Sequence, residues 1–233
     1  MRVLAIGAHP DDLEILCGGT LAKYAKRGDE VYMAVATNGE VGSIRHTREE
    51  IAAIRYEEAK RSAEVIGAKL IWMNYPDEFL FNDKETRLKF IDVIRQARPD
   101  VMFVHGTNDY HPDHRTAGQI AQDARILSAV KLIETAYPPC DKIPHVFIMD
   151  NVGGYEFEPE VYVDITDTFE TKCKMLRMHE SQDELLRHMY GMSYVEYMTD
   201  LAKRRGEENN TQYAEAFRSL KTYPITGGHY LLP

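Results

Sequence analysis

Cysteines and long apolar runs are scarce in this 233-residue sequence. The three cysteines, Cys17, Cys140 and Cys173, lie far apart and form no CxxC pair, which argues against a zinc ribbon and against a disulfide framework. No stretch approaches the roughly 18 apolar residues that a membrane span requires. The apolar stretch at residues 3–8 is too short for a signal peptide. We therefore expect reduced thiols and a cytoplasmic protein without a membrane segment.

Basic residues are also in the minority. The sequence has 28 lysines and arginines against 37 acidic residues, a net charge of −9 with neutral histidines. Nucleic acids and anionic membranes are bound through clustered basic residues, so we expect neither as a partner. The apolar share of 44% is ordinary for a globular protein, and the length is sufficient to bury a core without disulfides.

Strand-like and helix-like patterns alternate along the first 135 residues. Short apolar runs predict buried strands at residues 3–7, 31–36, 70–75 and 101–105. Apolar residues at helical spacing predict helices at residues 13–26, 47–66, 84–98 and 112–130. Four β-α units with right-handed crossovers predict an α/β fold: a Rossmann-like, doubly wound, mainly parallel sheet with helices on both faces.

The pattern changes beyond residue 135, where prolines interrupt the chain. Residues 146–149 and 161–163 are expected to form later strands, and residues 168–204 are expected to be largely helical with a break near Gly191. We predict a single domain over residues 1–233. Residues 1–135 form its β-α core, and residues 136–233 supply the later strands and a helical extension at the rim of the crevice.

A tetrapeptide pattern occurs twice, as His9-Pro10-Asp11-Asp12 after the first expected strand and as His111-Pro112-Asp113-His114 after the fourth. Proline suits the first turn of a helix, and acidic residues are favourable there, so simple helix capping is one interpretation. In the common strand order 3-2-1-4, however, strands one and four are neighbours, and ligands bind at that switch point. Both motifs are then expected to open into one crevice and to form a metal or catalytic site.

The residue types in these motifs indicate which metal fits. Imidazole and carboxylate donors without a thiolate suit zinc or a similar divalent ion, and a catalytic zinc keeps three protein ligands. The five candidates exceed three, so two remain for acid–base chemistry: His9, Asp11, Asp12, His111 and His114. A dinucleotide site would need G-x-G-x-x-G after the first strand, which the sequence lacks.

These motifs resemble the PIG-L/LmbE-like family of zinc-dependent N-deacetylases. The resemblance also covers Gly18-Gly19, residues 37–40, Arg55, Glu58 and, more weakly, residues 179–182. It implies that His9, Asp12 and His114 bind one zinc ion and that Asp11 is the general base. It further implies that a cationic His111 stabilises the oxyanion and that Asp113 orients His111 by a hydrogen bond.

Three further residues are candidates for substrate binding. The resemblance places Arg55 near a sugar hydroxyl or a phosphate, whereas its spacing also allows an ordinary ion pair with Glu58 on a solvated helix face. Glu40 either contacts the substrate or is a polar loop residue. The hydroxyl of Tyr110 either reaches the oxyanion or is simply packed.

The implied activity is hydrolysis of the N-acetyl amide of an N-acetylglucosamine-type amino sugar or its conjugate. One alternative is an amidase acting on a larger thiol-sugar conjugate, and another is a noncatalytic sugar- or metal-binding protein. Asp11 and His111 argue against the latter, because a binding protein needs no general base. The resemblance also implies a homo-oligomer, a trimer or a hexamer.

Overall fold

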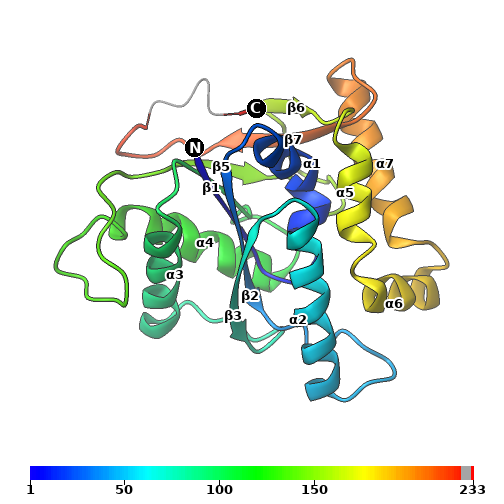
Figure 1. Ribbon diagram of the computed structural model, residues 1–233, viewed down its shortest axis with the longest axis horizontal. Helices are drawn as coiled ribbons and strands as arrows, with labels where there is room; N and C mark the ends of the chain where they lie inside the picture. Colours follow the sequence, from blue (N-terminus) through cyan, green and yellow to red (C-terminus); the bar gives the residue numbers. More distant parts are fainter. Residues whose placement is uncertain (227–231) are drawn as a thin grey trace.

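The computed structural model describes residues 1–226 and 232–233, and a single seven-stranded sheet runs through them (Figure 1). Its strand order is β3-β2-β1-β4-β5-β7-β6, with β1 to β5 parallel and β7 antiparallel to both of its neighbours. The strands are β1 (Arg2–Gly7), β2 (Glu30–Thr37), β3 (Lys69–Tyr75), β4 (Val101–Val104), β5 (His145–Met149), β6 (Val161–Asp164) and β7 (Ala214–Ser219).

Helices cover both faces of the sheet, as predicted. The helices are α1 (Asp12–Lys26), α2 (Arg48–Val65), α3 (Lys84–Ala97), α4 (Pro112–Leu127), α5 (Phe169–Leu176), α6 (Glu180–Tyr190) and α7 (Tyr194–Glu208). In Figure 1, α3 and α4 lie to one side of the sheet, and α1, α2 and α5 lie to the other. None of the helices in the described part of the chain combines the length and apolarity needed to cross a membrane.

Two cores flank the sheet because side chains alternate along each strand. In β1, Val3 and Ala5 belong to the core beneath α1 and α5, whereas Leu4 and Ile6 belong to the core beneath α3 and α4. All four are almost fully buried. This burial on both faces explains why the central strands read as nearly continuous apolar runs.

The predicted neighbour relation between the first and fourth strands is confirmed. β1 and β4 pair in parallel from Val3 with Val101 to Ile6 with Val104. The strand order reverses at this pair, since β2 lies on the other side of β1 and β5 on the other side of β4. The loops that begin at Ala8 and His105 therefore leave the sheet at the same edge, where ligands bind in open α/β sheets.

The C-terminal region is helical only in part. The predicted break at Gly191 is confirmed, since this residue ends α6 with φ +71°. Residues 214–219, which lie beyond the predicted helical segment and for which no element is predicted, form β7. A charged residue obscures this strand in the sequence, because Glu215 is buried and accepts hydrogen bonds from the main-chain N–H of Gly19 and Thr20 and from Lys172.

Close packing at α1 gives a stability prediction. A Cβ at Gly19 would lie 2.8 Å from side-chain atoms of buried Ile165, so Gly19→Ala should lower the free energy of unfolding by about 1–3 kcal/mol. At Gly18 the nearest atom, on Lys172, is 3.4 Å away. Gly18→Ala should therefore leave stability unchanged or raise it by up to about 1 kcal/mol. Urea unfolding of the two variants measures both effects, and equal destabilisation would contradict this account of the packing.

Candidate functional site

The two His-Pro-Asp motifs meet at the carboxyl edge of β1 and β4. Asp11 precedes α1 and Asp12 begins it, while His111 caps α4, which Pro112 begins. Together they bring most of the predicted site residues into one cavity of about 240 Å³, which neither Glu40 nor Asp113 lines. The predicted residues that line it are His9, Asp11, Asp12, Arg55, Tyr110, His111 and His114.

Three side chains in this cavity bring donor atoms to the spacing of a metal site. His9 Nδ1 lies 3.2 Å from His114 Nε2, His114 Nε2 lies 3.2 Å from Asp12 Oδ1, and His9 Nδ1 lies 3.5 Å from Asp12 Oδ2. Tetrahedral zinc with bonds of about 2.0–2.2 Å separates its donors by about 3.3 Å. The three side chains therefore fit one small divalent ion with little rearrangement.

Carboxylates lie behind both histidines. His9 Nε2 is 3.3 Å from Asp77 Oδ1 and 3.5 Å from Asp113 Oδ2, and His114 Nδ1 is 3.0 Å from Asp109 Oδ1. Such partners orient metal-binding histidines and raise their basicity. Although burial opposes protonation, the surrounding carboxylates raise the pKa of His9 to about 10 and that of His114 to about 9. The electrostatic field of these carboxylates strongly favours positive charge at His9 and His114, as a cation site requires.

His105 offers an alternative donor set with Asp12 and His114. It ends the strand expected at residues 101–105, is fully buried, and stacks on His114 with ring centroids 4.2 Å apart. Its Nε2 lies 3.1 Å from both the Ala8 nitrogen and Asp12 Oδ2. Because His105 does not line the cavity, a metal held by this set would be closed to substrate. His9, Asp12 and His114, in contrast, all line the cavity, so a metal that they hold would face the open space that a catalytic metal needs.

Asp11 is held in a strained position beside the three donors. Its φ of +122° is rare for a residue other than glycine. The Arg55 guanidinium secures it by donating to Asp11 Oδ2 at 2.8 Å and to the Pro10 carbonyl at 2.5 Å. Burial raises the pKa of Asp11 to about 6, while Arg55 opposes the rise and Asp12 adds to it. A carboxylate with this pKa is suited to exchange protons near neutral pH.

The surroundings of His111 disfavour the cationic form that the resemblance implies. Its Nδ1 accepts the main-chain N–H of Asp113 at 3.2 Å, as the cap of α4, and its Nε2 lies 3.1 Å from Glu78 Oε1. Burial lowers the pKa of His111, and the nearby His9 and His114 lower it further. These surroundings favour the neutral ring, and the contact with Glu78 favours a proton on Nε2, where the ring is a hydrogen-bond donor.

The Asp113 carboxylate also has another partner than expected. It accepts the main-chain N–H of Glu78 at 2.9 Å and that of Leu80 at 3.3 Å, and its Oδ2 faces His9. Only its main-chain N–H contacts the His111 ring. The reason is geometric: at the start of α4 the side chain points across to the loop after β3. Asp113 thus fixes that loop and supports His9.

Arg55 and Glu58 do not lie on a solvated face. Arg55 is 3% exposed and Glu58 is 2% exposed. The Glu58 carboxylate accepts the Ser181 N–H at 2.8 Å and the Ser181 hydroxyl at 2.7 Å, which ties α2 to α6. Arg55 lines the cavity, but its guanidinium is already paired with Asp11.

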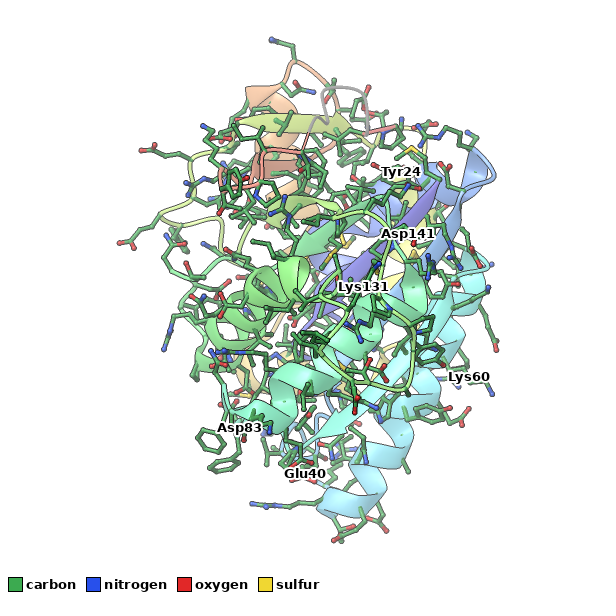
Figure 2. All side chains as sticks on the ribbon, turned by 90° about the vertical axis from the view of Figure 1, so that its left-hand side faces the viewer. Tyr24, Glu40, Lys60, Asp83, Lys131 and Asp141 are labelled. Atoms are coloured by element: carbon green, nitrogen blue, oxygen red, sulfur yellow. The ribbon has the colours of Figure 1, made fainter. Side chains whose placement is uncertain are left out.

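Of the other two candidates for substrate binding, Tyr110 lies at the cavity and Glu40 does not. Tyr110 is 65% exposed, lines the cavity, and contacts His111 and His114 edge-on. Glu40 is not among the residues that line the cavity. Its carboxylate accepts a hydrogen bond from Asn38 at 3.1 Å, and Figure 2 shows it at the lower edge of the molecule.

Several site residues escaped the sequence analysis. Asp77 and Glu78 follow β3, and His105 and Asp109 follow β4, so all four leave the sheet at the edge where His9 leaves it. The available signal was their position directly after strands at the switch point. Tyr194 of α7 also lines the cavity, and no local sequence signal marks it.

Comparisons with known proteins agree with this geometry. A family model described as "PIG-L: GlcNAc-PI de-N-acetylase" matches residues 4–125. The diacetylchitobiose deacetylase of Thermococcus kodakarensis is 32% identical over 224 residues, covering 93% of this chain and 82% of that protein. The 4-oxalmesaconate hydratase of Pseudomonas putida is 27% identical over 240 residues, covering 93% and 88%. The structure of N,N′-diacetylchitobiose deacetylase from Pyrococcus horikoshii superimposes with a TM-score of 0.82 at 30% identity, covering 99% of this chain and 88% of that one.

The carboxylate behind His114 provides a test of the metal centre. Asp109→Ala should weaken zinc binding by about 10- to 100-fold, because the imidazole loses the partner that orients it. His9→Ala should abolish stoichiometric binding by removing a donor. Asp141→Ala, at an exposed carboxylate, serves as the matched control. Zinc titration against a chelating indicator measures the affinities, with circular dichroism to verify folding. If Asp109→Ala bound zinc as tightly as the control, Asp109 would have no part in the centre.

Proposed function

Since this chain belongs to the PIG-L family of de-N-acetylases, we propose that it is a zinc-dependent hydrolase. It removes the acetyl group from an N-acetylated amino sugar of the N-acetylglucosamine type, or from a conjugate of one. The observation that carries the proposal is the convergence of three metal-donor atoms with Asp11 and His111 in a single cavity. One zinc ion per chain would be held by His9, Asp12 and His114.

The metal and the two remaining residues have separate tasks. A zinc ion bound here supplies Lewis acidity, which polarises a carbonyl group and lowers the pKa of water. Asp11 accepts the proton of the water molecule that attacks the acetyl carbon. His111 donates its Nε2–H to the developing oxyanion, as a neutral imidazole can. When the C–N bond breaks, the proton held by Asp11 passes to the leaving nitrogen, and the products are acetate and a free amine.

Arg55 affects the reaction by positioning Asp11 and by limiting the rise of its pKa. By holding one carboxylate oxygen at 2.8 Å, it positions the base and keeps its pKa from rising further, since Arg55 opposes the effect of burial. The resulting pKa of about 6 keeps Asp11 ionised at neutral pH. It also leaves Asp11 basic enough to take a proton in the transition state.

The charge of the cavity favours a neutral substrate. Among the described residues that line it, Arg55 is the only lysine or arginine, and it is paired with Asp11. The rest of the lining includes three further carboxylates, Asp12, Asp77 and Glu78. Apart from a zinc ion held by the three donors, the described lining has no unpaired lysine or arginine that would offset the repulsion of an anionic substrate. An N-acetylated sugar is therefore favoured over a polycarboxylate of the kind that the Pseudomonas putida hydratase is named for.

Product analysis tests the proposal. The zinc-loaded chain is incubated with N-acetylglucosamine and a panel of its conjugates, and acetate and free amine are quantified together. Equal amounts of both are expected. Release of a larger acid would favour an amidase acting on thiol-sugar conjugates, and sugar binding without turnover would favour a binding protein. Hydration of an unsaturated carboxylate would assign the chain to the hydratase chemistry instead.

We also propose that the chain works as a cytoplasmic homo-oligomer, a trimer or a hexamer. The family resemblance supports the oligomer, and the three free, buried cysteines are compatible with a reducing compartment. Sedimentation equilibrium measures the oligomeric state, and a monomer at micromolar concentration would contradict the oligomer.

Substitution of the proposed base separates metal binding from turnover. Asp11→Asn preserves the shape of the side chain and leaves the three donors in place, so zinc should remain at one ion per chain. Turnover should fall by about 10²- to 10⁴-fold, because the amide cannot accept the proton. Acetate release and elemental analysis on the same preparation measure both quantities. Near-complete activity in this variant would remove Asp11 from the mechanism.

A further inference from the structure

The start of α6, together with the residue before it, contacts three elements around Asp11. His179, which precedes the helix, is fully buried and places its Nε2 3.1 Å from Glu14 Oε1 of α1. The same carboxylate oxygen accepts the hydroxyl of Ser62, in α2, at 2.5 Å. Ser181 donates two hydrogen bonds to a buried carboxylate of α2. The start of α6 therefore joins the two helices on which the proposed base and its arginine partner depend.

Gln182 reaches the third element, the loop after β2. Its side chain is 5% exposed, lines the catalytic cavity and donates from Nε2 to the Gly42 carbonyl at 3.0 Å. The Gly42 N–H donates to the Gly39 carbonyl at 3.1 Å, and we call residues 39–42 the glycine turn. Another main-chain N–H of this turn donates to Asp77 at 3.4 Å. The glycine turn is thus held both by α6 and by the loop after β3.

The glycine turn lies directly against the Arg55 guanidinium. A Cβ at Gly42 would lie 2.8 Å from Arg55 Nη1, and a Cβ at Gly39 would lie closer still. Gly39 also has φ +67°, a conformation that glycine adopts without strain. The contact is this close because neither residue carries a side chain. Through Nη2 the same guanidinium donates to Asp11 Oδ2 at 2.8 Å, so Arg55 contacts the turn and the proposed base at once.

Packing against the glycine turn fixes the part of Arg55 that hydrogen bonds do not. Its two hydrogen bonds, to Pro10 and Asp11, both come from Nη2. Among the residues that the structure describes, the buried Nε of Arg55 has no hydrogen-bond partner. A turn that moved away would therefore free one side of the guanidinium. The base would then lose its fixed position, and a displacement of about 1 Å can lower a rate by up to about 10²-fold.

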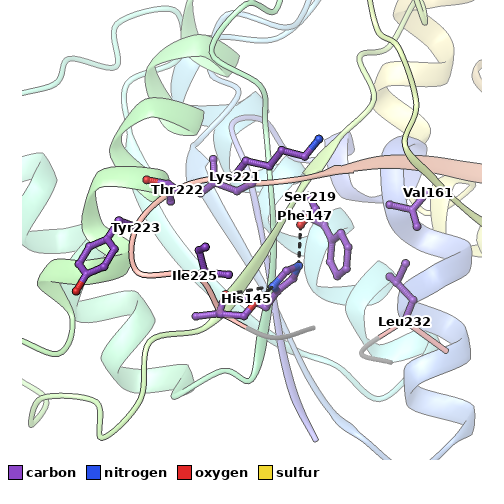
Figure 3. Close-up of a pocket in the computed structure, with 11 residues that line it drawn as sticks. His145, Phe147, Val161, Ser219, Lys221, Thr222, Tyr223, Ile225 and Leu232 are labelled. Atoms are coloured by element: carbon purple, nitrogen blue, oxygen red, sulfur yellow. Dashed lines mark hydrogen bonds between the residues drawn. The ribbon is translucent and has the colours of Figure 1, made fainter. Parts of the chain in front are cut away.

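The largest cavity of the described chain takes no part in this path of contacts. It measures about 650 Å³ and lies between β5, β7 and the C-terminal segment, where His145 contacts Ser219 at 3.1 Å (Figure 3). His145 begins β5, so this cavity lies at the opposite end of that strand from the catalytic edge. It shares no lining residue with the catalytic cavity. The position of the base is therefore set on the side of α6 alone.

We propose that Gln182 is a positioning residue for the hydrolysis: through the glycine turn it holds Arg55 against Asp11 and so fixes the base beside the metal donors. This assignment rests on the proposed function and deepens it, because it gives the segment at residues 179–182 a part in the reaction. Gln182 also lines the cavity, so the experiment must separate positioning from direct contact with the substrate.

Gln182→Met keeps the length of the side chain and removes its N–H donors. In the zinc-loaded chain, kcat should fall by about tenfold, because the base loses its fixed position. The substrate is N-acetylglucosamine or whichever of its conjugates the wild type hydrolyses fastest. KM and zinc stoichiometry should stay within about twofold, because the substrate contacts and the three metal donors remain. Gln119→Ala is the matched control, because this exposed glutamine of α4 lies outside the cavity.

A double-mutant cycle with Arg55→Lys determines whether the effect passes through Arg55. Lysine keeps the charge but has no planar guanidinium to pack against the glycine turn, so kcat should fall in this variant too. In that background Gln182→Met should lower kcat by less than about twofold, because the path is already broken. A second tenfold loss, an Arg55→Lys chain as active as the wild type, or a higher KM with unchanged kcat in Gln182→Met would overturn the proposal.

Hydrogen exchange adds a readout that does not depend on activity. The peptide covering residues 38–47 should exchange its amides about threefold faster, or more, in Gln182→Met than in Gln119→Ala, because the Gly42 N–H belongs to the released turn. Equal exchange in the two variants would reject the positioning role even in an active enzyme. A wild type that hydrolysed no acetylated sugar would refute the proposed function separately, and the exchange rates would still decide whether Gln182 holds the turn.

Discussion

The parallel pairing of β1 with β4 is the constraint on which the site depends. His9 and His114 are 105 residues apart in sequence, yet their ring nitrogens lie 3.2 Å apart. This happens because both strands end at the same edge and each leads through a short loop into a helix that proline or an acidic residue begins. The rigid sheet and two helix N-termini therefore set the donor geometry, and long flexible loops have little influence on it.

The second constraint is an excess of buried negative charge around His9 and His114. Asp12 meets a proposed cation, Asp109 and Asp113 support the histidines from behind, and Arg55 partly neutralises Asp11. Each carboxylate thus has a partner of opposite charge or a set of N–H donors, as buried charges require. The same arrangement leaves no unpaired lysine or arginine in the described lining of this cavity, which supports the proposal of a neutral substrate.

The C-terminal third completes the site that the β-α core begins. Tyr194 and Gln182 bring α7 and α6 to the catalytic cavity, and the loop after β5 contributes Val152. Buried ion pairs hold this region in place: Lys172 with Glu215, and Arg205 with Asp150. Removing one partner of such a pair leaves an uncompensated buried charge. The ion pairs therefore add to the apolar packing that holds this region in place. Part of the lining of the catalytic cavity therefore comes from the region where the sequence patterns are least regular.

The sequence by itself determined the alternation of strands and helices, the switch point and the two His-Pro-Asp motifs. Each of these depends on local periodicity or on residues adjacent in the chain. Only the tertiary structure revealed β7, because a buried glutamate breaks the apolar pattern of that strand. It also showed that Asp77 and Asp109 stand behind the histidines, that Arg55 pairs with Asp11, and that burial and the neighbouring histidines lower the pKa of His111. These facts depend on which distant side chains share a desolvated space, and burial and pairing of that kind leave no local pattern in a single sequence.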